Sequence, residues 1–262
     1  MNNLDGAILP HTPVTLCYGP VDVRAVAAED IVASIRGQWT PCPGHNSEGE
    51  QCELSREPVV SAWSTRGWSQ VLRVVRYPAA ASLAAFRVTV EGGGIVDVAE
   101  NHSLIRSDGG LVSPRDLVVG LEAGKPDTLL QAPMGTTVIA AQVSAFDLKN
   151  YTMRDDGLVE AADHAAAQLA VLRFGAMGHE LVDAQECAAG HPAGALPDEM
   201  RCTCVMLRFA PAKEADAHTH VRGRGRVRTI ERLHHREGGH TYALVTAEGV
   251  FAAGVGSLLV AG

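Results

Sequence analysis

Short apolar runs broken by turn-forming residues dominate most of this chain. Residues 8–36 and 58–121 alternate brief Val, Ile and Leu stretches with Gly, Pro, Asp and Asn. Half-buried strands place apolar and polar side chains alternately, as residues 71–76, 86–90 and 95–98 do. The pattern predicts many short strands, a tight hairpin turn at residues 107–110 and an exposed polar loop over residues 39–57.

The middle of the chain has a different pattern. Residues 156–173 are typical of a helix, with a cap at Asp155 or Asp156 and a stop at the glycines 175 and 178. Its predicted apolar face consists of Leu158, Ala162, Ala165, Leu169 and Leu172. A linker rich in Gly, Pro and Ala follows over residues 187–200, and the strand pattern returns from Cys202, first in the run 204–209. We therefore predict a mostly β protein with a helical (α+β) insertion.

Composition and charge narrow the class of protein. The 262 residues are 46% hydrophobic, enough for one large domain or one and a half, and the formal net charge is −8. This charge argues against a general nucleic-acid binder. The basic run 222–228 alternates with Gly and Val, which favours a solvated strand or hairpin. The sequence has no apolar run of eighteen residues and no signal-peptide pattern, so we expect a cytoplasmic protein, or one located with an intracellular host, that binds no membrane.

Six cysteines raise the question of a metal site. In an intracellular chain we expect them to be reduced and mostly buried, with Cys17 in a core strand. Two sets could be drawn as zinc ligands: Cys42, His45 and Cys52, and Cys187, His191, Cys202 and Cys204. Neither has the paired CxxC spacing of a strong zinc motif. We expect no cofactor, and a zinc-stabilised binding protein is the weakest alternative.

The blocks that carry a family likeness occur in a fixed order along the chain. They are TPVTLCYG at 12–19, WSTRGW at 63–68, VDVAENHSL at 96–104, SPRDL at 113–117 and YALVTAEGVFAAGVGSLLVAG at 242–262. Together they resemble inteins, most closely those inside family B DNA polymerases of large DNA viruses. The last block matches the closing segment of that family without gaps, and the likeness runs from about Ala7 to Gly262.

The resemblance implies the Hint (hedgehog/intein) fold, an all-β horseshoe with pseudo-two-fold symmetry that brings both chain ends to one cleft. Residues 1–121 and 206–262 would be its two halves, and residues 122–205 the insertion. It also implies autocatalytic protein splicing rather than enzymatic turnover, by a monomer whose partners are the flanking extein polypeptides. A first Cys or Ser attacks the preceding carbonyl, the acyl group passes to a downstream nucleophile, and a terminal Asn cyclises to release the joined flanks.

Seven positions of this sequence correspond to the reactive residues of the family, and most of them carry a different residue here. By position in the blocks they are the first residue Ala7, the middle-motif Thr, Asp and His positions Ala99, Asn101 and His102, the late Asp position Ala243, and the terminal His-Asn positions Ala261 and Gly262. Only His102 keeps the family's side chain, an imidazole that can donate and accept a proton near neutral pH. A methyl group can do neither, and each such loss costs about 10²–10⁴ in rate. We therefore predict a splicing-deficient copy.

Several alternatives stay open at this point. The alanines could be deliberate replacements that trap a precursor, or natural divergence, which Asn101, Gly249 and Val250 favour. The chain could instead be a non-catalytic Hint-fold interaction or scaffold module. A homing endonuclease is rejected, since residues 122–205 are too few and lack paired metal-binding carboxylates.

Overall fold

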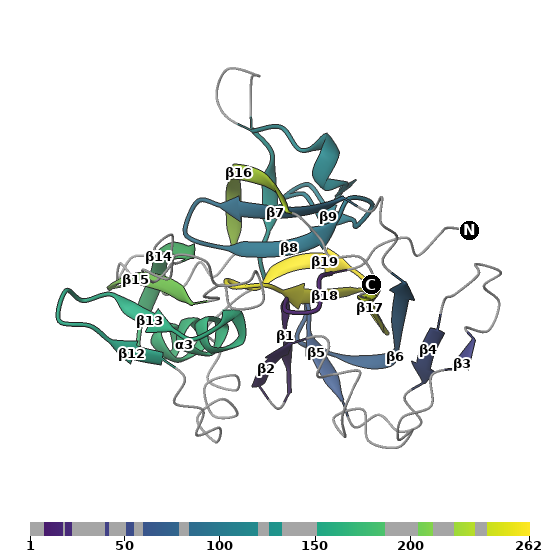
Figure 1. Ribbon diagram of the computed structural model, residues 1–262, viewed down its shortest axis with the longest axis horizontal. Coiled ribbons are helices and arrows are strands. Elements are labelled where there is room, and N and C mark those ends of the chain that lie inside the picture. The colour runs from purple at the N-terminus through teal and green to yellow at the C-terminus, as the bar shows by residue number, and fades with distance from the viewer. Residues whose placement is uncertain are drawn as a thin grey trace, which may run out of the picture.

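The computed structural model describes residues 8–17, 19–22, 40–41, 51–54, 60–78, 84–119, 126–132, 151–186, 204–211, 223–233 and 240–262. These residues fold mostly into antiparallel strands, and their helical segments are α3 (His164–Ala176) and the 3-10 turn η1 (Pro114–Asp116). The expected mostly β class with a helix-bearing insertion is confirmed (Figure 1). Within the described part, no helix has the length and apolarity needed to cross a membrane.

The largest sheet mixes strands from both ends of the chain, in the order β10-β9-β19-β18-β1-β5-β6-β4-β3, with β17 on β6 and β2 on β1. Its strands are β1 (Pro13–Leu16), β2 (Gly19–Asp22), β3 (Thr40–Pro41), β4 (Gln51–Leu54), β5 (Ser61–Trp63), β6 (Trp68–Pro78), β9 (Leu104–Ile105), β10 (Leu111–Val112), β17 (His240–Thr246), β18 (Val250–Ala253) and β19 (Leu258–Ala261). A second sheet has the order β11-β16-β7-β8, from β7 (Ala85–Val90), β8 (Ile95–Ala99), β11 (Thr128–Leu130) and β16 (Arg224–Leu233).

The main hydrophobic core draws on both of these sheets and joins strands from before and after the insertion. It combines buried residues of the early strands, such as Val14 and Val98, with Leu244, Phe251 and Val260 near the end. Burying apolar side-chain surface is the main favourable term in folding, so this shared core holds the two parts of the chain together. The two predicted β halves therefore make one body.

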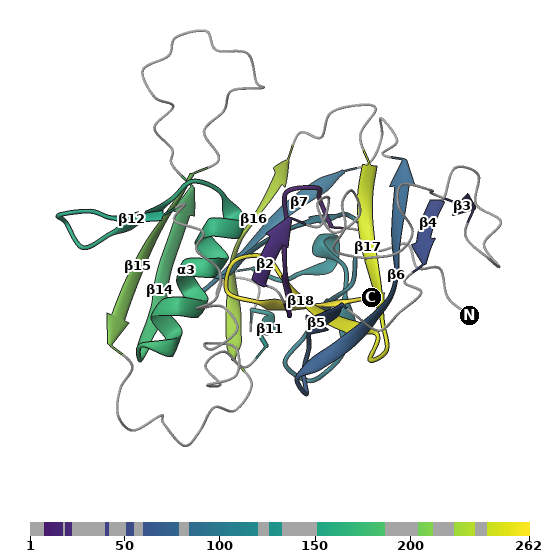
Figure 2. The ribbon, with the colours of Figure 1, turned by 90° about the horizontal axis from the view of Figure 1, so that it is seen from below.

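The insertion is a separate four-stranded sheet with a helix on it. The order is β12-β13-β15-β14, from β12 (Tyr151–Met153), β13 (Val159–Ala161), β14 (His179–Glu186) and β15 (Val205–Pro211), and α3 packs against it (Figure 2). The apolar run at 204–209 supplies β15. Since β15 pairs with β13 and β14, this unit runs through the boundary expected at residue 205 and extends to Pro211.

The predicted helix over residues 156–173 is wrong in its first eight residues. Residues 154–157 form a turn with Gly157 at φ +79°, and Val159 begins a strand that pairs with β15. The helix starts at His164, where the Asp163 side chain accepts a hydrogen bond from Ala166 N–H at 2.7 Å. The cap is therefore Asp163 and not Asp155 or Asp156, because a Gly-containing turn and a strand partner outweigh helical spacing. The expected stop is confirmed, since α3 ends at Ala176 and Gly178 follows at φ +79°.

Three other expectations have mixed outcomes. The segment expected to be a loop over residues 39–57 contains β3 and β4. Polar residues can form these strands because β4 pairs with the edge of the long strand β6 through backbone groups. Cys17 lies just beyond the end of β1 and is half-buried, so its placement in a core strand is wrong. The basic run is confirmed as a solvated strand: in β16, Arg224, Arg226 and Arg228 are exposed, while the residues between them are buried.

Candidate active site

The segment after the predicted first intein residue lies between two strands that carry motif residues. Ala7 itself lies outside the described residues. Ile8 is fully buried, donates its N–H to the Tyr242 carbonyl at 2.8 Å and accepts from Tyr242 N–H at 3.0 Å. It also forms a bridge with Val98 of β8. The backbone of residue 8 is therefore held beside positions 99 and 243 of the family motifs.

The middle motif forms the end of β8 and the turn that follows it. Ala99 is buried at the last position of β8, and its carbonyl accepts the His102 N–H at 3.0 Å. His102 is fully buried, whereas Asn101 is exposed at the tip of the turn. The turn thus directs the His102 side chain inward. Asn101 is therefore separated from the buried residues of this motif.

The C-terminal motif reaches the same region from the other side. Val260 pairs with Leu104, and the Ala261 N–H donates to the Ser103 carbonyl at 3.0 Å, directly after His102. The Gly262 N–H donates to the Gly249 carbonyl at 2.9 Å. Ala261 therefore lies next to the middle motif, and Gly262 lies beside Gly249, the residue before β18.

Position 243 has a less direct place in this arrangement. Its backbone lies in β17 between Tyr242, which pairs with Ile8, and Leu244, which Gly262 approaches. The Ala243 side chain, however, packs with Val75 in a small cluster, while its two neighbours in β17 face the main core. Side chains alternate between the faces of a strand, so a side chain at 243 leaves β17 on the face opposite Tyr242.

A buried charge network that the sequence analysis missed lies beside β8. Arg87 donates to both carboxylate oxygens of Asp97, from Nε at 2.8 Å and from NH2 at 2.6 Å, and its NH1 pairs with Glu186. His11 Nε2 lies 2.6 Å from Asp97 Oδ2, and His164 Nε2 lies 3.1 Å from Glu186 Oε1. Arg87 and Asp97 are register partners in the β7–β8 hairpin, and opposite charges five residues before and five residues after Gly92 were a usable signal.

Hydrogen bonding decides the ionisation of this network. Burial alone would raise the pKa of Asp97, but the hydrogen bonds from Arg87 and His11 outweigh it and hold that pKa well below its usual range. Burial also opposes ionisation of Glu186, and its contacts with His164 and Arg87 again lower the pKa. Both carboxylates are therefore charged at neutral pH, and the Arg87 guanidinium donates hydrogen bonds to both of them.

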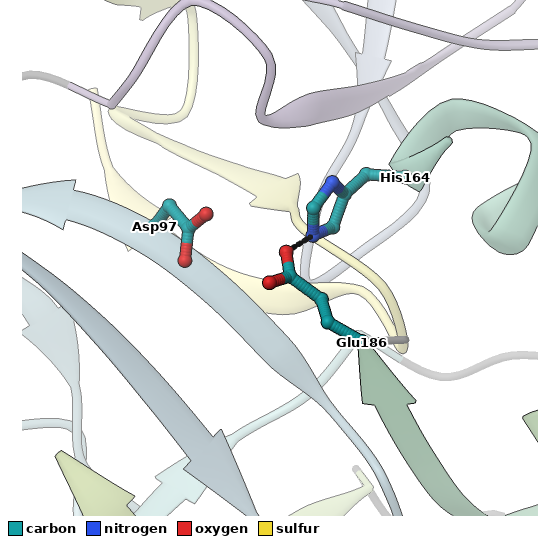
Figure 3. A group of neighbouring side chains, drawn as sticks. All are labelled: Asp97, His164 and Glu186. Atoms are coloured by element: carbon teal, nitrogen blue, oxygen red, sulfur yellow. Dashed lines mark ion pairs between the residues drawn. The ribbon is translucent and has the colours of Figure 1, made fainter. Parts of the chain in front are cut away.

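Three of these side chains have metal-ligand chemistry, and Figure 3 draws them together. One ligand atom each from Asp97, His164 and Glu186 lies within 4.8 Å of the other two. The Arg87 guanidinium, however, donates to both carboxylates. A cation would have to displace it, so the geometry is that of an ion-pair network. Of the cysteine–histidine zinc sets, only the Cys204 side chain is described, and it is buried.

A second buried polar cluster attaches the insertion to the strand pair that ends at Ala261. Gln168 of α3 is fully buried; its Nε2 donates to Ser257 Oγ at 2.6 Å and Thr15 Oγ at 3.2 Å, and its Oε1 accepts the Gly256 N–H at 2.7 Å. Apolar packing continues across the same boundary, where Leu169 shares a cluster with Leu259. The insertion and the β body are therefore parts of one core.

Comparisons with known proteins give similarity in structure only. No protein-family profile matches the sequence, and no curated protein matches it. Among solved structures, the chain is similar to the transcription factor IIB Mvu mini-intein, with 14% identity, a TM-score of 0.47 and coverage of 98% of this chain and 99% of that one. It is also similar to the TvoVMA intein, with 14% identity, a TM-score of 0.48 and coverage of 97% and 96%. An intein from a hyperthermophile has 8% identity, a TM-score of 0.47 and coverage of 98% and 99%.

Proposed function

We propose that this chain is an intein-type protein-splicing element on a Hint fold, and that it is splicing-deficient as written. The observation that carries the proposal is the convergence of its motif segments. Residue 8 pairs with Tyr242 and Val98, while Ala261 hydrogen-bonds Ser103, next to the buried His102. Splicing needs both junctions and one shared set of catalytic groups in a single place, and proximity of this kind supplies much of the rate.

Each missing group removes a defined step from that chemistry. Ala7 offers no atom to attack the preceding carbonyl. Ala99 offers no hydrogen bond to that carbonyl, and Gly262 offers no amide to cyclise. His102 keeps an imidazole where the N-terminal junction would be polarised. The element then stays in its precursor, bonded to the flanking polypeptides.

Finer assignments follow from the same proposal. The residues of the blocks at 96–104 and 113–117 favour descent from an intein of a viral family B DNA polymerase, and the partners would be the flanking exteins in cis. The element would be a monomer located with its host protein inside the cell, with no nucleic acid and no cofactor. Residues 1–121 and the strands that follow Pro211 would supply the two Hint halves.

The N-terminal step can be tested without the C-terminal residues. A reporter fused upstream of residue 1, combined with Ala7→Cys and Ala99→Thr, should form a thioester at residue 7 that an added thiol cleaves, releasing the reporter with residues 1–6. Adding His102→Ala to this pair should abolish the release, and the same fusion with Ala7 unchanged is the background control. No thiol-dependent release from a folded Ala7→Cys, Ala99→Thr chain would contradict the proposal.

One observation favours the alternative, a non-catalytic Hint-fold interaction module. A Cβ atom built on Gly262 would lie 2.2 Å from the Leu244 carbonyl oxygen and 2.8 Å from the Phe251 ring. An asparagine at this position therefore requires the backbone to move, so the end of β19 is adapted to glycine. Full restoration adds Ala243→Asp, Ala261→His and Gly262→Asn with a downstream Ser or Cys. Reporter release at residue 7 with no ligation even then would locate the loss at the C-terminal junction, and silence at both junctions would favour the module.

A further inference from the structure

Asp97 attaches the residues after Ile8 to the β body. Its backbone carbonyl accepts the Leu9 N–H at 3.1 Å and the Thr12 hydroxyl at 2.8 Å. Its carboxylate lies 2.6 Å from His11 Nε2. Three of the four residues that follow Ile8 are thus bonded to one residue of β8.

Arg87 fixes the Asp97 side chain and is itself held by the insertion. The guanidinium is largely buried, with 12% of the side chain exposed, and two of its nitrogens bind the Asp97 carboxylate. NH1 binds Glu186 at the end of β14, whose other oxygen faces His164 at the first turn of α3 (Figure 3). One buried cation is therefore shared between a carboxylate of the body and one of the insertion.

We propose that the insertion acts as a clamp on the N-terminal segment, in which Glu186 orients Arg87, Arg87 orients Asp97, and Asp97 positions residues 9–12. The consequence for the residue-7 junction rests on the proposed splicing function, whereas the clamp itself does not. Without the Glu186 charge, Arg87 NH1 loses its charged hydrogen bond and the guanidinium is held by Asp97 alone, because a hydrogen bond to a carboxylate is stronger than one to a neutral acceptor. Asp97 then loses a fixed partner, and the segment loosens.

The chain offers a matched control for this clamp. Asp183 is also a β14 carboxylate that pairs with an arginine of the body, Arg228, at 3.1 Å. That arginine is 54% exposed, and the pair lies on the surface, where ion pairs contribute little. Glu186→Gln and Asp183→Asn therefore each remove one insertion-to-body ion pair, and only the first touches the clamp.

Amide hydrogen exchange on the native chain tests the clamp directly. Glu186→Gln should raise the exchange rates of the Leu9 and Thr12 amides by about tenfold or more, the loss expected for one charged hydrogen bond, while Asp183→Asn leaves them unchanged. Unchanged rates at these two amides in folded Glu186→Gln, or an equal rise in both variants, overturn the proposal. If Glu186→Gln does not fold, Glu186→Asp, which withdraws the carboxylate by one methylene, takes its place in the same comparison.

A second readout separates the clamp from the splicing function. In the Ala7→Cys, Ala99→Thr background, Glu186→Gln should slow thiol-dependent reporter release by about tenfold, and Asp183→Asn should not. Faster amide exchange with no release in any background supports the clamp and refutes the splicing proposal. Normal release with unchanged exchange refutes the clamp alone.

Discussion

Replacing Gln168 by leucine tests whether the insertion and the β body form one core. The amide side chain is fully buried and makes three hydrogen bonds, to Gly256 N–H, Ser257 Oγ and Thr15 Oγ. Leucine has a similar volume but leaves the Gly256 N–H and the two hydroxyls without this partner. A buried donor left unsatisfied costs about 1–3 kcal/mol, and the extra apolar contact offsets only part of the loss. We expect Gln168→Leu to lower the free energy of unfolding by about 2–4 kcal/mol.

Urea unfolding followed by tryptophan fluorescence and by far-UV circular dichroism measures this change. Both signals should report one shared transition, shifted to lower urea in Gln168→Leu, because Trp63 of the body shares an apolar cluster with Leu169 and Leu172 of α3. Gln185→Leu is the control, since the Gln185 side chain is exposed on β14 and, among the residues described, hydrogen-bonds only the nearby Asp183 carboxylate. A loss below about 1 kcal/mol in Gln168→Leu, or separate transitions for the two signals in the unmodified chain, would refute the reasoning.

Three further predictions concern single positions. Gly254→Ala should destabilise the protein by about 2–3 kcal/mol in thermal or urea unfolding, because φ is +76° and a Cβ would lie 2.1 Å from the Ile95 carbonyl oxygen. Gly175→Ala in α3, where the Cβ meets open space, should be neutral or stabilising by up to about 1 kcal/mol. Equal effects of the two substitutions would contradict this prediction. Asp163→Ala should cost about 1 kcal/mol by removing the α3 cap, and Asp155→Ala should cost almost nothing, so a larger loss at 155 would return the cap to its predicted place. Folding lowers the pKa values of Asp97 and Glu186, so their contribution to stability is present above about pH 4 and is lost as the pH falls further. In urea unfolding from pH 7 to pH 3, the free energy of unfolding should therefore fall less steeply in Glu186→Gln than in the unmodified chain. Identical pH dependences of the two proteins would count against the network.

Local sequence patterns predicted β7 and β8, which pair as a hairpin, but β8 is buried along its whole length, Asp97 included, and not on one face only as the alternation suggested. The same reasoning extended α3 too far. Leu158 and Ala162 fit a helical spacing, but Leu158 closes the turn that begins at Arg154, and Ala162 directly follows β13. Strand pairing across distant residues, such as Val159 with Leu207, is invisible to a local window. The polar residues at 51–54 were assigned to a loop for the same reason.

The candidate site, like the fold, was predicted from the sequence only in part. Motif positions at the ends of β8 and β19 were found from the resemblance of their sequence blocks to inteins, and the structure brings Ala99, His102 and Ala261 to one region. The charge network was missed because it joins residues 11, 87, 97, 164 and 186, which come from five separate segments. The tight fit at Gly262 depends on Leu244 and Phe251, and no spacing rule relates those residues to the end of the chain.

The most direct test of a splicing-deficient intein is the intact mass of the unmodified chain expressed between two reporter proteins. The account predicts a single species, the full precursor, with every peptide bond in place, because neither residue 7 nor residue 262 carries a reactive group. A ligated pair of reporters together with a free chain of 262 residues or fewer would contradict it.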